Sequence, residues 1–227
     1  MKRRMLSLVL MVLLLSPLLR VGICADQTIY RSVNTGGMKI ALTFDDGPHP
    51  HLTHEILSIL DEYGVKATFF MVGVNVRAYP DAAREVIAAG HEVGNHTYSH
   101  PLLPRLCREQ LACEIEACED VLEELCEYRP HLFRPPQGVL NEAVEACSES
   151  GDYSLILWSL DTRDWECKNT EQIVGTVLSS VRAGDIVLMH DYIGTHSKTP
   201  EALRILLPRL LEMGFELTTV SELLGKG

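Results

Sequence analysis

From residue 39 onward the chain alternates short apolar runs with longer segments of helical periodicity, and this alternation restricts the possible folds most. Seven of the runs are rich in β-branched, aromatic and other apolar side chains and have the length of strands. We predict these strands at 40–44, 67–72, 92–94, 132–133, 155–158, 186–189 and 215–220. The intervals between them hold amphipathic patterns that begin or end at helix-capping residues. We predict helices at 52–63, 80–89, 106–128, 141–150, 171–181 and 200–213, and a last turn from 221.

Seven β-then-α units predict a parallel sheet covered by helices, because parallel strands need long crossover connections. The pattern leaves two closures open, a doubly wound open sheet and a barrel-like sheet of fewer than eight strands. Polar residues follow five of the strands, and active sites assemble at this end of parallel sheets. Because polar residues from five strands surround one end of the sheet, the barrel is favoured over the open sheet. We therefore predict an α/β fold, a distorted (β/α) barrel of about seven parallel strands, with the active site at their carboxyl ends.

The first 25 residues differ from the rest of the chain. Lys2, Arg3 and Arg4 precede an apolar run over 5–19, and small residues follow near Ala25. This order is typical of a secretory signal, although an uncleaved membrane anchor is the alternative. We expect a signal or anchor at 1–25, an extension at 26–38 and one enzyme domain at 39–227. The protein is then secreted or associated with the cell wall, and touches a membrane only through an uncleaved N-terminal segment.

Composition excludes several classes of protein. The 227 residues include 20 Lys and Arg against 31 Asp and Glu, a net charge of −11, so a nucleic-acid partner is not expected. Apolar residues make up 46% of the chain, which excludes a disordered polymer. No pair of cysteines has the Cys-x-x-Cys spacing of a zinc knuckle. The pairing of Cys107, Cys113, Cys118, Cys126, Cys147 and Cys167 stays open, although Cys118 lies in register with the apolar face of its helix.

A metal site is indicated by three residues that follow predicted strands. His96 and His100 are four residues apart, which brings two imidazoles to one side of a helical turn. With Asp46 they form a set of two histidines and one carboxylate, and such a set leaves open positions for water and substrate on zinc. Asp45 precedes Asp46, so in an extended chain the two side chains point to opposite sides. One carboxylate can therefore bind the metal while its neighbour acts as a base.

Five segments in this order resemble the motifs of the polysaccharide deacetylases, the NodB-homology domain of carbohydrate esterase family 4. The segments are TFDDGP at 43–48, HTYSHP at 96–101, RPPQG at 134–138, DTRDW at 161–165 and LMHD at 188–191. The resemblance covers about residues 39–224. The segments KATFF at 66–70 and TTVSEL at 218–223 look most like exported Gram-positive members that act on cell-wall glycan.

The resemblance implies a divalent metal, usually zinc, with cobalt or another divalent ion as the alternative. Asp46, His96 and His100 match the metal ligands and Asp45 matches the general base. In the family the metal polarises the acetamide carbonyl and activates a water molecule. His190 matches the general acid that protonates the leaving amine.

The resemblance also implies supporting roles for five further residues. Asp164 matches the carboxylate that raises the basicity of the acid histidine, and Arg134 matches the residue that orients the base. The backbone N–H of Gln137 matches the oxyanion donor, although an aromatic residue is more usual at this position. Trp165 and Leu188 match the apolar walls around the acetyl methyl group. Asp161 has a weaker case than Asp164.

We therefore expect a monomeric, metal-dependent hydrolase that removes N-acetyl groups from N-acetylglucosamine units of a polysaccharide. Peptidoglycan is the first choice of substrate and chitin oligosaccharide the second. The alternatives are an O-deacetylase of the acetylxylan type, a catalytically silent glycan-binding protein and a mononuclear iron oxygenase, which uses a similar ligand set.

The remaining histidines match no ligand and are expected to face solvent. They are His49, His51, His54, His91, His131 and His196.

Overall fold

The computed structural model describes residues 29–192 and 197–226, and within these ranges nine strands form one sheet. The strands are β1 (Ile29–Tyr30), β2 (Lys39–Asp45), β3 (Thr68–Met71), β4 (Glu92–Asn95), β5 (Leu132–Phe133), β6 (Ser154–Ile156), β7 (Leu160–Asp161), β8 (Ile186–His190) and β9 (Glu216–Thr218). Their order is β1-β6-β5-β4-β3-β2-β8-β7, and β9 pairs with β2. The pairings between these strands are parallel.

The predicted distorted barrel is confirmed. The seven predicted strands match seven of the nine observed strands, and β1 and β7 were not predicted. Each of these two strands has two residues and lies at an edge of the sheet, where its pairing partner rather than an apolar run defines it. Strand β1 belongs to the predicted extension at 26–38, and it pairs with β6. The same extension donates a hydrogen bond from the Val33 N–H to the Gly184 carbonyl at 2.9 Å. Part of the extension is therefore joined to the sheet.

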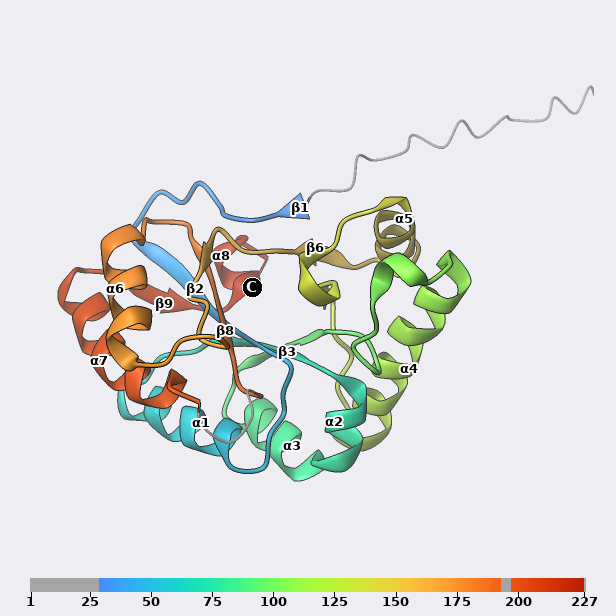
Figure 1. Cartoon of the computed structure of the whole chain (residues 1–227), viewed down its shortest axis with the longest axis horizontal. Coiled ribbons are helices and arrows are strands. Elements are labelled where there is room, and N and C mark those ends of the chain that lie inside the picture. The colour runs from blue at the N-terminus through green and yellow to red at the C-terminus, as the bar shows by residue number, and fades with distance from the viewer. Residues whose placement is uncertain (1–28, 193–196, 227) are drawn as a thin grey trace, which may run out of the picture.

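Helices surround the sheet, as the crossover connections require. They are α1 (Leu52–Glu62), α2 (Gly73–Ala78), α3 (Pro80–Ala88), α4 (Arg108–Cys126), α5 (Glu142–Ser150), α6 (Thr170–Ser180), α7 (Thr199–Glu212) and α8 (Val220–Leu223). Figure 1 shows α6, α7, α1, α3, α2 and α4 in an arc around the strands. The sequence pattern did not predict α2, because this helix has only six residues and two buried positions.

The central strand β2 is buried on both faces, which explains its nearly continuous apolar sequence. Phe44 packs in the cluster beneath the outer helices, whereas Ala41 packs in a second cluster inside the barrel. Helix α8 contributes Val220 and Leu223 to this inner cluster. The N–H of Val220 donates to the Thr68 hydroxyl at 2.9 Å, at the first residue of β3. Helix α8 therefore packs at the amino-terminal end of the barrel, opposite the strand ends predicted to carry the site.

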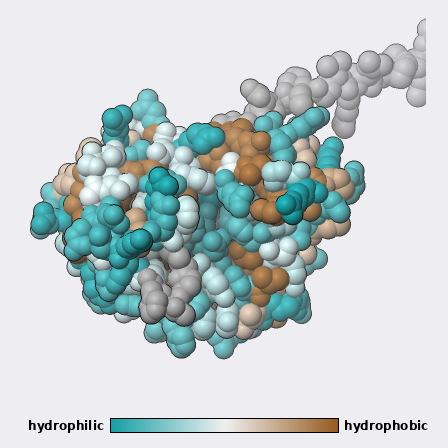
Figure 2. Space-filling view, viewed as in Figure 1, coloured by the Kyte–Doolittle hydropathy of each residue, from teal (hydrophilic) through white to brown (hydrophobic). Residues whose placement is uncertain are grey.

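The surface seen in Figure 2 is mostly hydrophilic, with hydrophobic residues in separate patches. In the described part of the chain no helix is long and apolar enough to cross a membrane. The signal or anchor predicted at 1–25 lies outside the described residues.

The six cysteines within the described ranges are free thiols, and Cys118 is buried as predicted.

One histidine prediction is wrong. His91 is buried, not exposed, because its ring packs edge-on against Phe69 and its Nδ1 accepts the Ala67 N–H at 3.1 Å. Burial lowers its pKa to about 4, so the ring is neutral. His51, His54 and His131 are exposed as predicted, and His49 is partly buried. His196 lies outside the described residues.

Candidate active site

A cavity of 440 Å³ opens at the carboxyl ends of the strands. It is lined by Asp45, Asp46, His96, His100, Gln137, Trp158, Asp161, Trp165, Leu188 and His190. Eight of the ten site residues predicted from the sequence are in this set. The other two, Arg134 and Asp164, are buried behind the cavity and contact residues that line it. The structure thus brings all ten predicted residues together at the predicted end of the barrel.

Asp46, His96 and His100 form a cluster that could hold one metal ion. The Oδ1 atom of Asp46 lies 3.4 Å from Nε2 of His96 and 3.3 Å from Nε2 of His100. One potential ligand atom from each residue lies within 4.8 Å of the others. Asp46 Oδ1 is buried and has no hydrogen-bond partner among the described residues. A buried acceptor without a donor, facing two imidazoles, fits a cation.

The tautomer of His96 is set by the backbone of the next strand. Its Nδ1 lies 2.7 Å from the Arg134 carbonyl, which can only accept, so Nδ1 carries a proton. In the neutral ring this leaves the Nε2 lone pair directed at Asp46, as a metal ligand requires. Burial disfavours a charged ring here, yet the nearby carboxylates of Asp45 and Asp46 raise the pKa of His96. The His96 side chain is only 2% exposed.

The charged groups of the cluster shift the pKa values of their neighbours. Burial disfavours the Asp46 carboxylate, but the nearby imidazoles of His96, His100 and His190 hold its pKa below the usual value. Burial and repulsion from His96 lower the pKa of His100. Asp46 is therefore ionised and His100 favours its neutral form, which is the protonation state of a metal ligand.

Left-handed backbone conformations concentrate at this site. The φ angles of Asp46, Thr97, His100 and Gln137 are 74°, 69°, 52° and 58°. Such values are unusual for residues other than glycine, and for a β-branched threonine especially so. The Thr97 N–H is held at 2.8 Å by the Oδ1 of Asn95, the last residue of β4. Local hydrogen bonds thus keep the ligand loop in a conformation that is costly by itself.

Asp45 forms a buried ion pair with Arg134. The Nη1 atom of Arg134 donates to Oδ1 of Asp45 at 2.6 Å, and Nη2 donates to the Leu157 carbonyl at 3.0 Å. The guanidinium carbon lies 4.0 Å from the centre of the Phe70 ring. Arg134 has no exposed surface, so removing the Asp45 charge would leave a buried cation unpaired. The second oxygen of Asp45 lies 3.7 Å from Nε2 of His96, on the side of the metal-ligand cluster.

His190 forms the opposite arm of the site. Its Nδ1 lies 2.8 Å from Oδ1 of Asp164, and its backbone N–H donates to Oδ2 at 2.8 Å. Burial opposes a charged imidazole, but the hydrogen bond and the charge of Asp164 raise the pKa of His190 to about 9. In the parallel pairing of β2 with β8, Asp45 and His190 are partners. The base candidate and the acid candidate therefore lie on adjacent strands.

Two residues of the cavity wall were not assigned to the site from the sequence. Trp158 follows β6 and sits against the turn of Gln137, where a Cβ on Gly138 would lie 2.6 Å from its ring. Trp158 is the last residue of the strand predicted at 155–158, so the apolar pattern assigns it to the strand and not to the site. Asp161 ends β7 and lines the cavity, although its sequence context favours a site role less than that of Asp164 does. Trp165 is 55% exposed at the cavity, where its ring can meet a ligand.

A further buried carboxylate, Asp191, lies beside the loop that carries Asp46. It accepts a hydrogen bond from the Thr53 hydroxyl at 2.6 Å, and its backbone N–H donates to the Asp45 carbonyl at 3.1 Å. A Cβ on Gly47 would lie 2.1 Å from the Asp191 carboxylate, so a side chain there would displace it. Burial raises the pKa of Asp191 to about 7. Asp191 lies in the LMHD segment, but no role was predicted for it, because its partners are distant in the chain.

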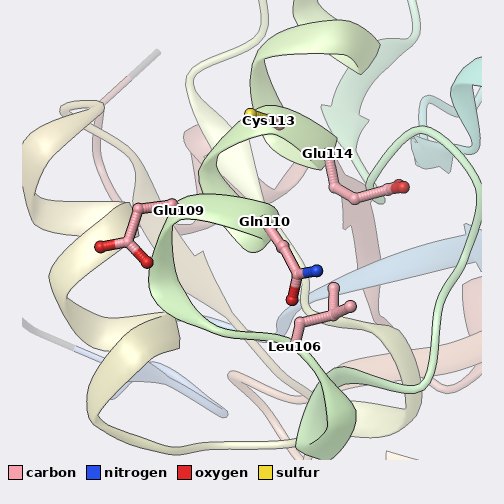
Figure 3. A pocket seen from close by; sticks show the side chains of 5 residues that line it. All are labelled: Leu106, Glu109, Gln110, Cys113 and Glu114. Carbon is pink, nitrogen blue, oxygen red and sulfur yellow. The ribbon is translucent and has the colours of Figure 1, made fainter.

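A second cavity, of 420 Å³, lies on the first turns of α4. Figure 3 shows its lining residues, which are Leu106, Glu109, Gln110, Cys113 and Glu114. None of them belongs to the predicted site. Glu114 nevertheless reaches the ligand loop, because its carboxylate accepts the Ser99 N–H and hydroxyl, both at 2.8 Å.

Comparison with known proteins adds independent evidence. A sequence profile of the family described as polysaccharide deacetylase matches residues 32–156. A peptidoglycan-N-acetylglucosamine deacetylase of Bacillus cereus is 41% identical over 187 residues, which are 82% of this chain and 87% of that protein. A chitooligosaccharide deacetylase of Bradyrhizobium sp. is 34% identical over 201 residues, covering 83% of this chain and 92% of that protein.

A solved structure agrees with the sequence comparisons. The crystal structure of the Bc1960 peptidoglycan N-acetylglucosamine deacetylase, in complex with 4-naphthalen-1-yl-N-oxidanyl-benzamide, superimposes with a TM-score of 0.83. The two sequences are 32% identical in this comparison, which covers 86% of this chain and 92% of that chain.

Proposed function

This chain belongs to the polysaccharide deacetylase family, and from that premise we propose that it removes N-acetyl groups from N-acetylglucosamine units of peptidoglycan. The similarity to the Bacillus cereus deacetylase supports this substrate. The similarity to a chitooligosaccharide deacetylase makes chitin oligosaccharide the second candidate. Both substrates carry the same acetamido group, so the reaction is the same and only recognition of the glycan differs.

The observation that carries the proposal is the placement of two proton-transfer groups around one metal-ligand cluster. Asp45 is ion-paired with Arg134 on one side, and His190 is hydrogen-bonded to Asp164 on the other. Both groups line the cavity that contains the cluster. Amide hydrolysis needs a base to activate water and an acid to protonate the leaving nitrogen. A binding protein without catalytic activity has no need of either buried pair.

We propose that Asp46, His96 and His100 hold a divalent metal, with zinc as the first choice and cobalt as an alternative. Two imidazoles and one carboxylate match catalytic zinc sites with open positions. When bound, the metal would polarise the acetamide carbonyl and lower the pKa of a water molecule.

Asp45 acts as the base in this proposal. Arg134 holds Oδ1, which leaves Oδ2 on the side of the cluster to take the proton of the attacking water. The water oxygen then forms a bond with the acetamide carbon. The backbone N–H of Gln137 would donate to the resulting oxyanion, as a positioned donor in a partly enclosed site. The left-handed turn at Gln137 lines the same cavity.

His190 acts as the acid. Asp164 holds Nδ1, so the Nε2 proton is the one available to the substrate. As the carbon–nitrogen bond breaks, this proton passes to the sugar nitrogen, and acetate and a free amine are released. Leu188, Trp158 and Trp165 would form the apolar walls around the acetyl methyl group and the sugar ring.

We propose that the protein is exported, acts on the cell wall and functions as a monomer. The sequence pattern over 1–25 supports export, with an uncleaved anchor as the alternative. The enzyme domain is proposed to run over 39–227, preceded by the extension at 26–38.

An acetate-release assay with zinc-loaded protein on three substrates in parallel tests the proposal. The substrates are peptidoglycan, chitin oligosaccharides and acetylxylan. We expect acetate from peptidoglycan at the highest kcat/KM, and less from the chitin oligosaccharides. Release from acetylxylan alone would contradict the N-deacetylase proposal in favour of an O-deacetylase. Glycan binding without acetate release would indicate a silent binding protein.

A further inference from the structure

The Asp164 carboxylate, which supports the proposed acid, has a third donor besides the two atoms of His190. The hydroxyl of Thr199 donates to Oδ2 at 2.7 Å. Oδ2 therefore accepts from the Thr199 hydroxyl and the His190 N–H, whereas Oδ1 faces Nδ1 of the ring. The three bonds together fix both the position of the carboxylate and its rotation.

Burial makes this third bond consequential. Thr199 has no exposed surface and Asp164 is 3% exposed, so water does not readily replace a lost donor. A hydrogen bond to a buried charged group is stronger than one between neutral groups. Without the hydroxyl, Oδ2 would keep only the backbone N–H of His190, and the carboxylate could turn away from Nδ1.

Thr199 reaches Asp164 from a separate part of the fold. It is the first residue of α7, whereas Asp164 follows β7. The start of α7 is itself attached to the first residue of α6, because Thr170 donates to the Glu201 carboxylate at 2.8 Å. Buried residues such as Leu203 fix α7 against the core. The hydroxyl is thus held by a packed helix, which suits it to orient a neighbouring group.

We infer that Thr199 is a positioning residue of the acid arm, whose hydroxyl keeps Asp164 aligned with Nδ1 of His190. This inference rests on the proposed role of His190 as the general acid. Thr199 touches neither the substrate nor the metal-ligand cluster in this account. Its loss should therefore slow the proton transfer and leave substrate binding nearly unchanged.

The test compares Thr199→Val, which removes the hydroxyl at nearly constant shape, with Thr199→Ser, which keeps the hydroxyl. Thr176→Val is the matched control, because Thr176 is exposed on α6 and bonds only its own helix, at the Gln172 carbonyl. With zinc-loaded protein and a chitin oligosaccharide, Thr199→Val should lower kcat about tenfold at nearly constant KM. Thr199→Ser should retain kcat within about twofold of wild type, as should the control.

A measurement independent of turnover separates this inference from the proposed function. In ¹⁵N-histidine-labelled protein, the Nδ1–H resonance of His190 is assigned by its loss in His190→Gln. We expect Thr199→Val to broaden or remove this resonance, and Thr199→Ser to keep it. An unchanged resonance and kcat in Thr199→Val would overturn the inference. Equal losses in Thr199→Val and Thr199→Ser would also overturn it, because they would assign the effect to packing. If wild type released no acetate, the proposed function would fail while the resonance still tested Thr199.

Discussion

The Asp45 carboxylate has two tasks in this site, because it is the proposed base and also the counter-charge of buried Arg134. Asp45→Asn keeps an oxygen that can accept from Arg134 but cannot take up the proton at neutral pH. We expect kcat to fall by at least about 100-fold, since a general base contributes on this scale. Metal should remain bound at Asp46, His96 and His100. Acetate release and metal content measure the two effects separately.

The same variant should be less stable, by roughly 3–5 kcal/mol, because Arg134 loses a charged partner in a buried position. Thermal unfolding measures this loss, and the kinetic assay is therefore made well below the unfolding temperature. Unchanged turnover in folded, metal-loaded Asp45→Asn would show that Asp45 is not the base.

His190 makes the activity and the stability depend on pH. Without metal, its pKa is raised to about 9, against the effect of burial, by Asp164 and by the charges of Asp45 and Asp46. The charged ring therefore stabilises the metal-free fold fully below about pH 6.5, and this contribution disappears as the pH rises through about 9. A general acid must hold its proton, so activity declines on the same alkaline side.

Metal binding should lower the pKa of His190, because a cation at Asp46 offsets one of the carboxylate charges that raise it. We expect an NMR titration to give a pKa of about 9 for His190 in metal-free protein and a lower value after zinc addition. His54, which is exposed and bonded to Glu85, serves as the internal control. Equal pKa values of His190 in both forms would contradict the placement of the metal beside the acid.

Single residues were predictable where a short motif contains them. The spacing of His96 and His100, and the adjacency of Asp45 and Asp46, are local properties of the chain. The contact of Thr199 with Asp164 joins positions 35 residues apart, and that of Thr53 with Asp191 joins positions 138 apart. Such contacts depend on which elements become neighbours, and no local pattern contains this information.

At the level of secondary structure, the segments that form strands were easier to predict than the order of these strands in the sheet. The apolar runs identify β2 and β8 as buried strands, but their pairing depends on the whole sheet. This pairing is what brings Asp45 and His190 together. Helix α2 was missed although it packs against the ligand loop, where a Cβ on Gly73 would lie 2.5 Å from the ring of Tyr98.

Helix α4 supports the ligand loop through Glu114, which is one of the cavity-lining residues labelled in Figure 3. Its carboxylate accepts both the N–H and the hydroxyl of Ser99, which lies between the two histidine ligands in the sequence. We expect Glu114→Ala to weaken zinc binding by about tenfold, because outer contacts orient the ligands. Competition with a fluorescent zinc chelator measures the change.

The matched control is Glu116→Ala, which removes an exposed glutamate from the same helix. It changes the net charge by the same amount without contacting the loop. Equal zinc affinities in Glu114→Ala and Glu116→Ala would show that the contact with Ser99 does not support the site.

At the scale of the whole molecule, the barrel has a packed end and an open end. Helix α8 fills the amino-terminal end, and the cavity opens at the carboxyl ends of the strands. The alternation of strands and helices, together with the polar residues that follow five strands, was sufficient to predict the barrel and the end that carries the site. The short edge strands β1 and β7 were not predictable, because their pairing partners rather than their own sequences define them.

Metal binding should stabilise the whole fold, since the ligands come from the segments after β2 and β4 and the unfolded chain offers no such site. Free zinc at 100 times its Kd should add about 2.7 kcal/mol to the free energy of unfolding. Thermal unfolding with and without zinc measures this effect, and His96→Ala is the control. An equal shift in His96→Ala would show that zinc acts at another position.

We claim above all that one metal ion at Asp46, His96 and His100 enables hydrolysis of an N-acetylated glycan. Titration of zinc into metal-free enzyme, with acetate release from peptidoglycan as the readout, tests it most directly. We predict almost no acetate without metal, a linear rise up to one equivalent, and a constant rate beyond it. Acetate release that is independent of zinc, or none at one bound equivalent, would contradict the claim.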